Sequence, residues 1–319
     1  MEQDFVLESK KIEIPGFPHA FNPSIIRWKG SLLMSFRVIP NAKNPMISWL
    51  GLIWLDDNFD PIGPPQQLNI RNGNTIVPPR AEDARLITVG EKLYIVYSDN
   101  CDPIITKGGF RLYIGELNYN GLSFSVKNLD CLTRFEGASQ NIREKNWVPF
   151  DYKGKLLLAY SLDPHRILQP LPGMGSCETF AISKGTFDWD WGVLRGGTPG
   201  IIDGDHYLSF FHSSKKMATV HSNNQAMPHY FMGAYTFALE PPFEITGISP
   251  EPIIKKGFYS EPIYERYWGS VRVVFPCGYI FDEDYVWIAY GRQDHEACVL
   301  KLDKKGLLKS LVPIDRTTE

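Results

Sequence analysis

The chain of 319 residues is 43% hydrophobic and 22% charged, a composition typical of a globular protein with a sizeable core in one large or two ordinary domains. Its 33 Lys and Arg residues against 36 Asp and Glu residues give a net charge of -3 without a long basic run, which argues against a nucleic-acid or anionic-membrane partner. No secretory signal pattern opens the chain and no run of about eighteen apolar residues occurs, so we expect a cytoplasmic protein without a membrane span.

Cysteine, histidine and glycine spacings give no sign of a metal or cofactor. The cysteines are odd in number, widely separated and without a C-x-x-C pair, which favours reduced and mostly buried thiols: Cys101, Cys131, Cys177, Cys277 and Cys298. Four histidines form no compact ligand motif: His206, His212, His221 and His229. The glycine pairs 108–109 and 196–197 lack the spacing of a phosphate loop or dinucleotide site. We therefore predict neither a metal nor a cofactor.

Five stretches share one pattern: a polar lead, a short apolar strand, a turn rich in glycine or acidic residues, and a second apolar strand. The period-two alternation and the turns predict an antiparallel hairpin in each. The copies occupy residues 22–37, 84–98, 147–161, 199–213 and 273–291. A further apolar strand follows four of them, at residues 49–55, 110–117, 231–237 and 296–302.

The repeat predicts an all-β fold, a five-bladed propeller formed by residues 1–319 as a single domain. No segment has sustained helical periodicity, and 24 prolines with 27 glycines match a turn-dense β protein. Small sheets that recur at a long, regular spacing can cover one another's apolar faces in a ring. A plain β-sandwich is the alternative, although its strands usually recur every eight to twelve residues or so.

A propeller gathers the starts of its innermost strands around a central channel. The polar leads of the five copies are therefore expected to converge there: Asn22, Asp83, Lys145-Asn146, Arg195 and Arg272. Convergent polar groups in a concave mouth are the usual form of a small-molecule site, and a merely wet channel is the alternative. The densest lead is the run 80–85, in which a carboxylate pair lies between two arginines; a solvated loop with ordinary salt bridges is its simpler interpretation.

A set of short motifs spans nearly the whole chain. They are Asn22-Pro23, Arg37, Arg80-x-Glu82-Asp83-x-Arg85, Glu144-Lys145-Asn146, Gly197-x-Pro199, Phe211-His212, the run 274–278 and Tyr290-Gly291-x-x-Asp294. In this order they resemble the motifs of the β-mannoside phosphorylases, glycoside hydrolase family 130, which are inverting enzymes built as five-bladed propellers.

The resemblance implies roles for the matching residues. Asp83 takes the place of the sole catalytic acid, which in this family protonates the bridging oxygen through the mannose 3-hydroxyl while phosphate attacks the anomeric carbon from the opposite face. Substrate contacts are implied for Asn22, Arg37, Arg80, Glu82, Arg85, Asn146, Tyr230 and Asp294. Phosphate contacts are expected from Lys145, Arg195, His212 and Lys215. The implied partners are a β-mannoside or mannose 1-phosphate and inorganic phosphate, and a homo-oligomer is compatible with the sequence.

The chain also departs from the family pattern. Ala84 stands where the family usually has proline, and Tyr230 is followed by Phe231 where a Tyr-Arg pair usually precedes the glycine, so one customary cation is missing. Mannosyl transfer from a nucleotide sugar, as in related propellers, is therefore the main alternative. A glycan-binding propeller without turnover is another. Arg195 is equally compatible with a salt bridge between blades.

Hydrolysis is a third alternative, because an inverting hydrolase differs mainly in needing a second carboxylate about 6.5–9.5 Å from the first to activate water. Neighbours on a strand point to opposite faces, so Glu82 and Asp83 are not both expected to face the channel unless the strand begins after them. Other candidates for a second carboxylate are Asp294, Glu261, Glu265 and the acidic turn 282–284, of which the turn is expected to be solvated.

The presumed acid also sets a condition on its neighbours. A general acid must hold its proton near neutral pH, whereas arginines directed at it would lower its pKa. Arg80 and Arg85 are therefore expected to point away from Asp83, with Arg85 directed at substrate or phosphate. An anion is expected near Lys145.

Overall fold

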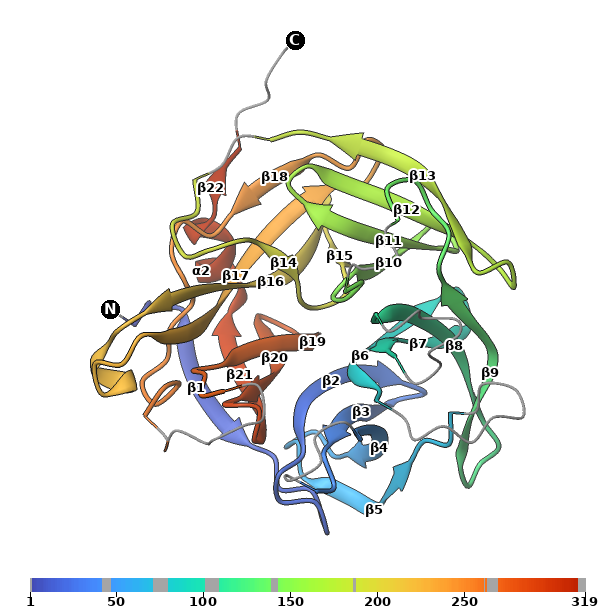
Figure 1. Ribbon diagram of the computed structural model, residues 1–319, viewed down its shortest axis with the longest axis horizontal. Helices are drawn as coiled ribbons and strands as arrows, with labels where there is room; N and C mark the ends of the chain where they lie inside the picture. The colour runs from blue at the N-terminus through green and yellow to red at the C-terminus, as the bar shows by residue number, and fades with distance from the viewer. Residues whose placement is uncertain are drawn as a thin grey trace.

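Five antiparallel sheets stand around a central axis in the computed structural model (Figure 1). The structure describes residues 2–41, 47–70, 80–100, 109–138, 143–185, 188–260, 262 and 269–314. The all-β, five-bladed propeller expected from the repeats is confirmed.

The first three blades each contain four strands in chain order, with the first strand at the channel. The first blade contains β2 (Phe21–Trp28), β3 (Ser31–Val38), β4 (Trp49–Leu55) and β5 (Pro61–Gln67). The second contains β6 (Glu82–Val89), β7 (Lys92–Asp99), β8 (Arg111–Tyr119) and β9 (Phe124–Leu132). The third contains β10 (Val148–Tyr152), β11 (Lys155–Leu162), β12 (His165–Leu171) and β13 (Ser176–Ser183).

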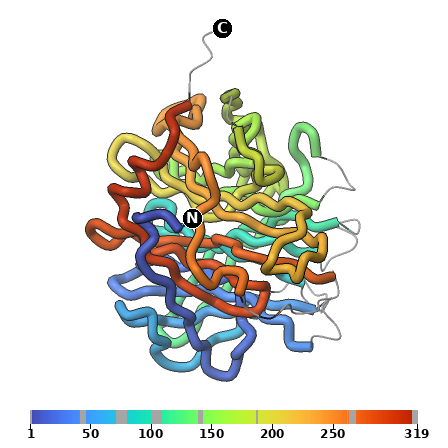
Figure 2. Tube along the Cα trace, turned by 90° about the vertical axis from the view of Figure 1, so that its left-hand side faces the viewer, coloured from blue at the N-terminus to red at the C-terminus, as the bar shows by residue number. Residues whose placement is uncertain are grey.

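The last two blades are less regular because both ends of the chain join them. In the fourth blade β14 (Arg195–Gly196) and β15 (Ile201–Asp203) both pair with β16 (His206–Met217), which is followed outward by β17 (Met227–Ala238), β18 (Ile245–Ile248) and β22 (Val312–Pro313). The fifth contains β19 (Val274–Asp282), β20 (Tyr285–Arg292), β21 (Glu296–Asp303) and, outermost, β1 (Val6–Lys11). Figure 2 shows the blue N-terminal strand beside the red C-terminal ones, so the N-terminus closes the ring.

The apolar core is divided among the five contacts between neighbouring blades. One cluster joins the first and second blades, for example, through Leu33, Leu86 and Ile95, and another joins the third and fourth through Phe150 and Phe237. Each blade therefore buries both of its faces against its neighbours. Because of this, the strands near the channel carry apolar side chains on both faces. The two described helices, η1 (Val220–Ser222) and α2 (Lys304–Ser310), are surface pieces, and within the described residues no helix is long and apolar enough to cross a membrane.

The innermost strands have two different ends. Toward the ends of β2, β6, β10, β15 and β19 lies a largely apolar hollow of about 700 Å³, with Ile25, Leu86, Ile201 and Tyr279 in its wall. Tight turns follow there, with φ angles of 50° and 82° at Lys29-Gly30, as a two-residue hairpin loop requires. The polar leads lie at the other end, where each innermost strand begins.

Candidate active site

The leads of the first three blades share an unusual backbone conformation. Asn22, Asp83 and Asn146 have φ angles of 48°, 53° and 65°, in the left-handed region that Asn and Asp tolerate better than other residues with a side chain. In the first two blades these residues lie where the register of the innermost strand pair shifts. Such a β-bulge re-aims the side chain.

The bulge at Asp83 brings two neighbouring carboxylates to the same side of the strand. Both belong to β6, where regular alternation would separate them. Instead Arg37 contacts both, with Nη2 2.9 Å from Glu82 Oε1 and Nη1 3.2 Å from Asp83 Oδ1. The expectation that Glu82 and Asp83 could not share one face was wrong, because it assumed an unbroken strand.

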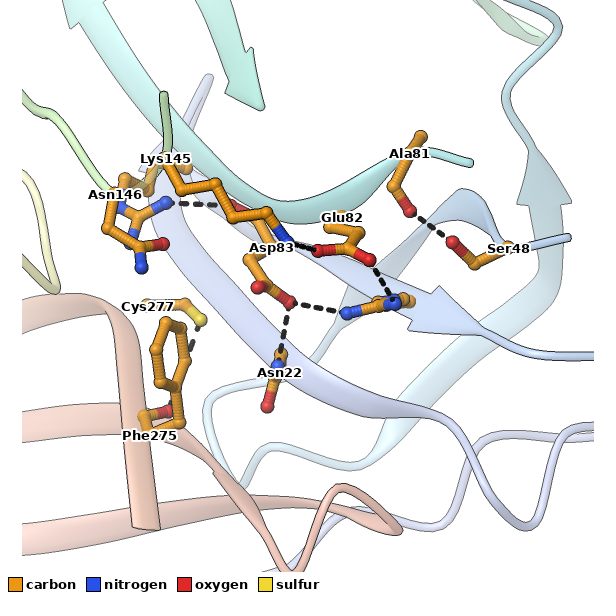
Figure 3. Close-up of polar contacts among 11 residues, drawn as sticks. Asn22, Ser48, Ala81, Glu82, Asp83, Lys145, Asn146, Phe275 and Cys277 are labelled. Carbon is orange, nitrogen blue, oxygen red and sulfur yellow. Dashed lines mark hydrogen bonds and ion pairs between the residues drawn. The ribbon is translucent and has the colours of Figure 1, made fainter. Parts of the chain in front are cut away.

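The two carboxylates differ in how fully their oxygens are used. Glu82 accepts from Arg37 through Oε1 and from Lys145 through Oε2 (Figure 3). Asp83 accepts through Oδ1 from Arg37 and from Asn22 Nδ2, the latter at 2.7 Å. Within the described residues no donor reaches Asp83 Oδ2. Asp83 is therefore the carboxylate with an oxygen left for a ligand.

Burial and neighbouring charges act in opposite directions on the Asp83 carboxyl. Desolvation raises its pKa, but Arg37, the Asn22 hydrogen bond, Lys145 and Arg85 outweigh this and leave the pKa below its usual value. These neighbouring charges therefore hold Asp83 ionised. The expectation considered only Arg80 and Arg85; the cation that bonds Asp83 directly is Arg37.

Arg85 braces the channel wall and does not extend into the cavity. It is fully buried; Nη1 donates to the Asp83 carbonyl at 2.8 Å, Nη2 to Asn146 Oδ1 at 3.2 Å, and Nε to the Gly197 carbonyl. It thus joins the second, third and fourth blades, and the expectation that it reaches toward substrate was wrong. Arg80 also points away from Asp83, with its guanidinium 5.0 Å from the centre of the Phe110 ring.

The fourth and fifth blades supply an aromatic and acidic side of the site. His212 is buried between Tyr230 and Phe275, with ring centroids at 6.0 and 4.4 Å. Its Nδ1 donates to the Gly196 carbonyl at 2.9 Å, and burial, helped by Arg85 and Arg195, lowers its pKa to about 3. His212 is thus neutral with its proton on Nδ1, so its ring has no second N–H for the phosphate contact expected of it. Burial and the nearby Asp294 carboxylate raise the pKa of the Tyr230 hydroxyl.

A cavity of about 480 Å³ opens between the leads of the third and fourth blades. Three cationic side chains line it, those of Arg143, Lys145 and Arg195. Arg195 is exposed, and the described part of the chain contains no hydrogen-bond partner for its guanidinium. Glu144 lies in the same wall, and burial raises the pKa of its carboxyl. This cavity is the part of the site suited to an anion.

Two of the expected residues lie apart from this cavity. Lys215 is exposed and donates to the Asp190 carbonyl at 2.8 Å. Arg272 is buried, and its Nε donates to the His221 carbonyl at 2.5 Å. It therefore connects the segment that precedes β19 to η1. Neither is among the residues that line the cavity.

The structure also locates most of the other carboxylates and of the cysteines that the sequence offered as candidates. The acidic turn 282–284 is exposed at the β19–β20 hairpin, as expected, while Glu261 and Glu265 lie outside the described residues. The described cysteines form no disulfide with one another: Cys131, Cys177, Cys277 and Cys298; Cys101 lies outside the described residues. Among the described residues no group of three or more His, Cys, Asp or Glu side chains could hold a metal ion.

Three residues of the site were given no role by the sequence argument. Phe110 carries the Lys145 ammonium 3.5 Å from its ring centre, on the same ring that Arg80 covers. Cys277 lies fully buried near Arg85 and Asp83 in an irregular stretch of β19. A Cβ on Gly291 would lie 1.8 Å from Asn22 Oδ1, so only glycine leaves room for that amide. Cys277 and Gly291 belong to the motifs at residues 274–278 and 290–294, but no role followed from the motifs for either, and Phe110 has neither a charge nor a motif that would single it out.

The fold matches solved structures of mannoside-active enzymes. A β-1,2-mannobiose phosphorylase from Listeria innocua, solved with β-1,2-mannobiose, has a TM-score of 0.61 at 17% identity over 95% of this chain and 92% of its own. A mannose phosphorylase from Leishmania mexicana, solved with a phosphate ion, has a TM-score of 0.61 at 12% identity over 97% and 92%. The chain has the fold of the β-mannoside phosphorylases.

A third structure connects this fold to hydrolysis. It comes from glycoside hydrolase family 130, whose mannoside phosphorylases include hydrolases that target β-1,2-mannosidic linkages in Candida mannan, and it has a TM-score of 0.63 at 14% identity over 90% of this chain and 85% of its own. No family model and no curated protein sequence matches the chain. The resemblance to the β-mannoside phosphorylases drawn from the motifs is thus supported by the fold.

Proposed function

We propose that the chain is an inverting β-mannoside phosphorylase. The observation that carries the proposal is a single carboxylate with a free oxygen, Asp83 Oδ2, whose neighbour Glu82 is ion-paired to Lys145 in the wall of a cavity that Arg143 and Arg195 also line. Phosphorolysis requires one proton donor and a site for phosphate, and this arrangement offers both.

The proposed reaction uses the two parts of the site in one displacement. A phosphate oxygen in the cation-lined cavity forms a bond to the anomeric carbon of the mannosyl unit as the glycosidic C–O bond breaks. The configuration inverts, giving α-mannose 1-phosphate. The leaving sugar oxygen receives a proton that originates on Asp83 and is relayed through the mannose 3-hydroxyl. The product keeps the energy of the glycosidic bond, which suits an enzyme of the cytoplasm.

Glu82 is unsuited to act as the base of a hydrolase. Both of its oxygens are already hydrogen-bonded to cations, and it lies beside Asp83 on one strand, whereas the water-activating carboxylate of an inverting hydrolase lies across the sugar at about 6.5–9.5 Å. Asp294 lies close enough to influence Arg37 and Tyr230, a position suited to sugar hydroxyls. The charges of the site thus favour phosphate over water.

The test is a product analysis with the purified protein. A panel of β-mannosides is incubated with and without inorganic phosphate, and mannose 1-phosphate and free mannose are measured; the reverse direction uses mannose 1-phosphate or GDP-mannose with sugar acceptors. We expect mannose 1-phosphate only when phosphate is present, and phosphate release in reverse. Free mannose formed without phosphate, products from GDP-mannose alone, or binding without turnover would each contradict the proposal. Asp83→Asn is the matched inactive control.

A further inference from the structure

Lys145 lies between two environments. On one side its ammonium forms an ion pair with Glu82, and on the other its side chain lines the cation-rich cavity. Its side chain is 17% exposed, and the Phe110 ring supports it from a third side. A lysine ammonium on a flexible stem can change partners without moving the backbone. The cavity is where the proposed function puts phosphate.

The charges around Asp83 are closely coupled. Groups from all five blades act on one another here: Arg37 from β3, Glu82 and Arg85 from β6, Lys145 before β10, His212 from β16, Tyr230 from β17, Cys277 from β19, and Asp294 after β20. Glu82 shares Arg37 with Asp83 and alone holds Lys145. A change at Glu82 therefore alters the proton affinity of the Asp83 carboxyl through both cations.

This arrangement leaves a difficulty for catalysis. The acid must carry a proton when the glycosidic bond breaks, yet the neighbouring cations favour the ionised form of Asp83. Some consequence of substrate binding has to raise the proton affinity of this carboxylate.

We propose that Glu82 is a positioning residue that couples anion binding to protonation of Asp83, because Lys145 turns from Glu82 to the incoming phosphate. This inference rests on the proposed function. When Lys145 turns to the anion, Glu82 keeps only Arg37 as a cationic partner and holds it more tightly. Arg37 then interacts less with Asp83, and the Lys145 charge is neutralised by phosphate. Each change disfavours the ionised form of Asp83, which takes a proton from solvent.

The coupling is measured as proton uptake during anion binding. Sulfate is the probe, because it keeps its charge over about pH 5 to 8 while phosphate itself titrates there. Calorimetric titrations in buffers of different ionisation enthalpy give the number of protons bound per sulfate. We expect wild-type uptake that approaches about one proton per anion at its maximum, as the carboxyl passes from ionised to protonated.

Four variants separate the contributions. Asp83→Asn should abolish the uptake, and Glu82→Gln should reduce it severalfold, because the neutral amide no longer forms ion pairs with Lys145 and Arg37. Glu82→Asp keeps the charge and should retain it. Glu116→Gln removes the partner of Lys92 in an exposed ion pair of 3.0 Å and serves as the matched control with wild-type uptake.

The outcomes distinguish this inference from the proposed function. If neither sulfate nor phosphate binds, the anion site and the proposed phosphorolysis are both wrong. If sulfate binds without proton uptake, or if Glu82→Gln takes up as many protons as the wild type, the anion site stands and the coupling is overturned. Should Glu82→Gln fail to fold, Lys145→Gln replaces it; full uptake per bound sulfate in that variant would also overturn the coupling.

Discussion

The two ends of the innermost strands differ in how closely they follow regular β geometry. At the turn end, side chains such as Ile25 and Tyr279 alternate as the strand period requires and surround an apolar hollow. At the leading end, Asn22 and Asp83 lie in bulges with left-handed backbone, and buried charges replace apolar side chains. Strained backbone of this kind costs about 1–3 kcal/mol per residue, and buried ion pairs rarely offset it. The stability therefore comes from the blade contacts, and the chemistry lies where the blades depart from regular geometry.

After loss of the acid itself, the largest effect is expected from closing the space that the leading end keeps open. Gly291→Ala places a methyl group 1.8 Å from Asn22 Oδ1, which must displace the amide from Asp83. A misplacement of about 1 Å in an active site costs on the order of 100-fold in rate. The measurement is kcat/KM for phosphorolysis. Gly247→Ala is the matched control, since its nearest contact is the Thr236 hydroxyl at 3.1 Å in the outer part of the fourth blade. Equal kcat/KM in the two variants would show that the position of the Asn22 amide does not matter for catalysis.

The second prediction concerns the stability of the fold and a buried histidine that lies in a contact between blades, outside the active site. Burial lowers the pKa of His165 to about 4, against an ordinary value of 6.5. Above pH 6.5 both folded and unfolded states are neutral; below it only the unfolded chain takes up the proton, so stability is lost as the pH falls. At about pH 5 this amounts to roughly 2 kcal/mol. Denaturant unfolding at about pH 5 and 7.5 measures it, and His165→Phe should flatten the dependence while turnover persists. An unchanged slope would contradict the assignment.

A third effect compares two cations that the sequence did not distinguish. Arg195 lines the cavity, whereas Lys215 is bonded to a backbone carbonyl elsewhere on the surface. Loss of one charge-assisted hydrogen bond costs about 1.5 kcal/mol or more. Arg195→Ala should raise the KM for phosphate by roughly tenfold with a smaller change in kcat. Lys215→Ala should leave both parameters unchanged. The reverse pattern would place the anion outside this cavity.

The smallest effect is expected at the turn end. Ile25 is buried there, and Ile25→Val should lower the free energy of unfolding by about 1 kcal/mol through a lost methylene. Activity per folded molecule should not change. Thermal unfolding and kcat together check this, and a substantial loss of kcat would show that the two ends are not separable.

The sequence predicted the fold well because apolar alternation and glycine turns are local signals. The hairpins at residues 22–37 and 147–161 correspond to the pairs β2–β3 and β10–β11. The outer strands β12 and β13 were missed because they lack a clear alternation, and the pairing of β1 with β21 joins segments almost 300 residues apart.

The site was predicted less completely than the fold. Asn22, Arg37, Glu82, Asp83 and Lys145 do lie together, as the motifs implied. Their orientation was not predictable, because a bulge at Asp83 reverses the strand alternation and no sequence pattern shows it. The roles of Arg85 and His212 depend on burial, which long-range packing decides.

The most direct test of the account compares Asp83→Asn with Asp294→Asn in phosphorolysis of a β-mannoside at saturating phosphate. The asparagine keeps the shape and the left-handed conformation at position 83 but cannot supply the proton. The account predicts that Asp83→Asn folds like the wild type and loses at least about 100-fold in kcat, within the usual range of roughly 10²–10⁴ for a general acid, and that Asp294→Asn mainly raises the KM for the mannoside. Near-wild-type turnover in Asp83→Asn, with turnover abolished in Asp294→Asn, would contradict it.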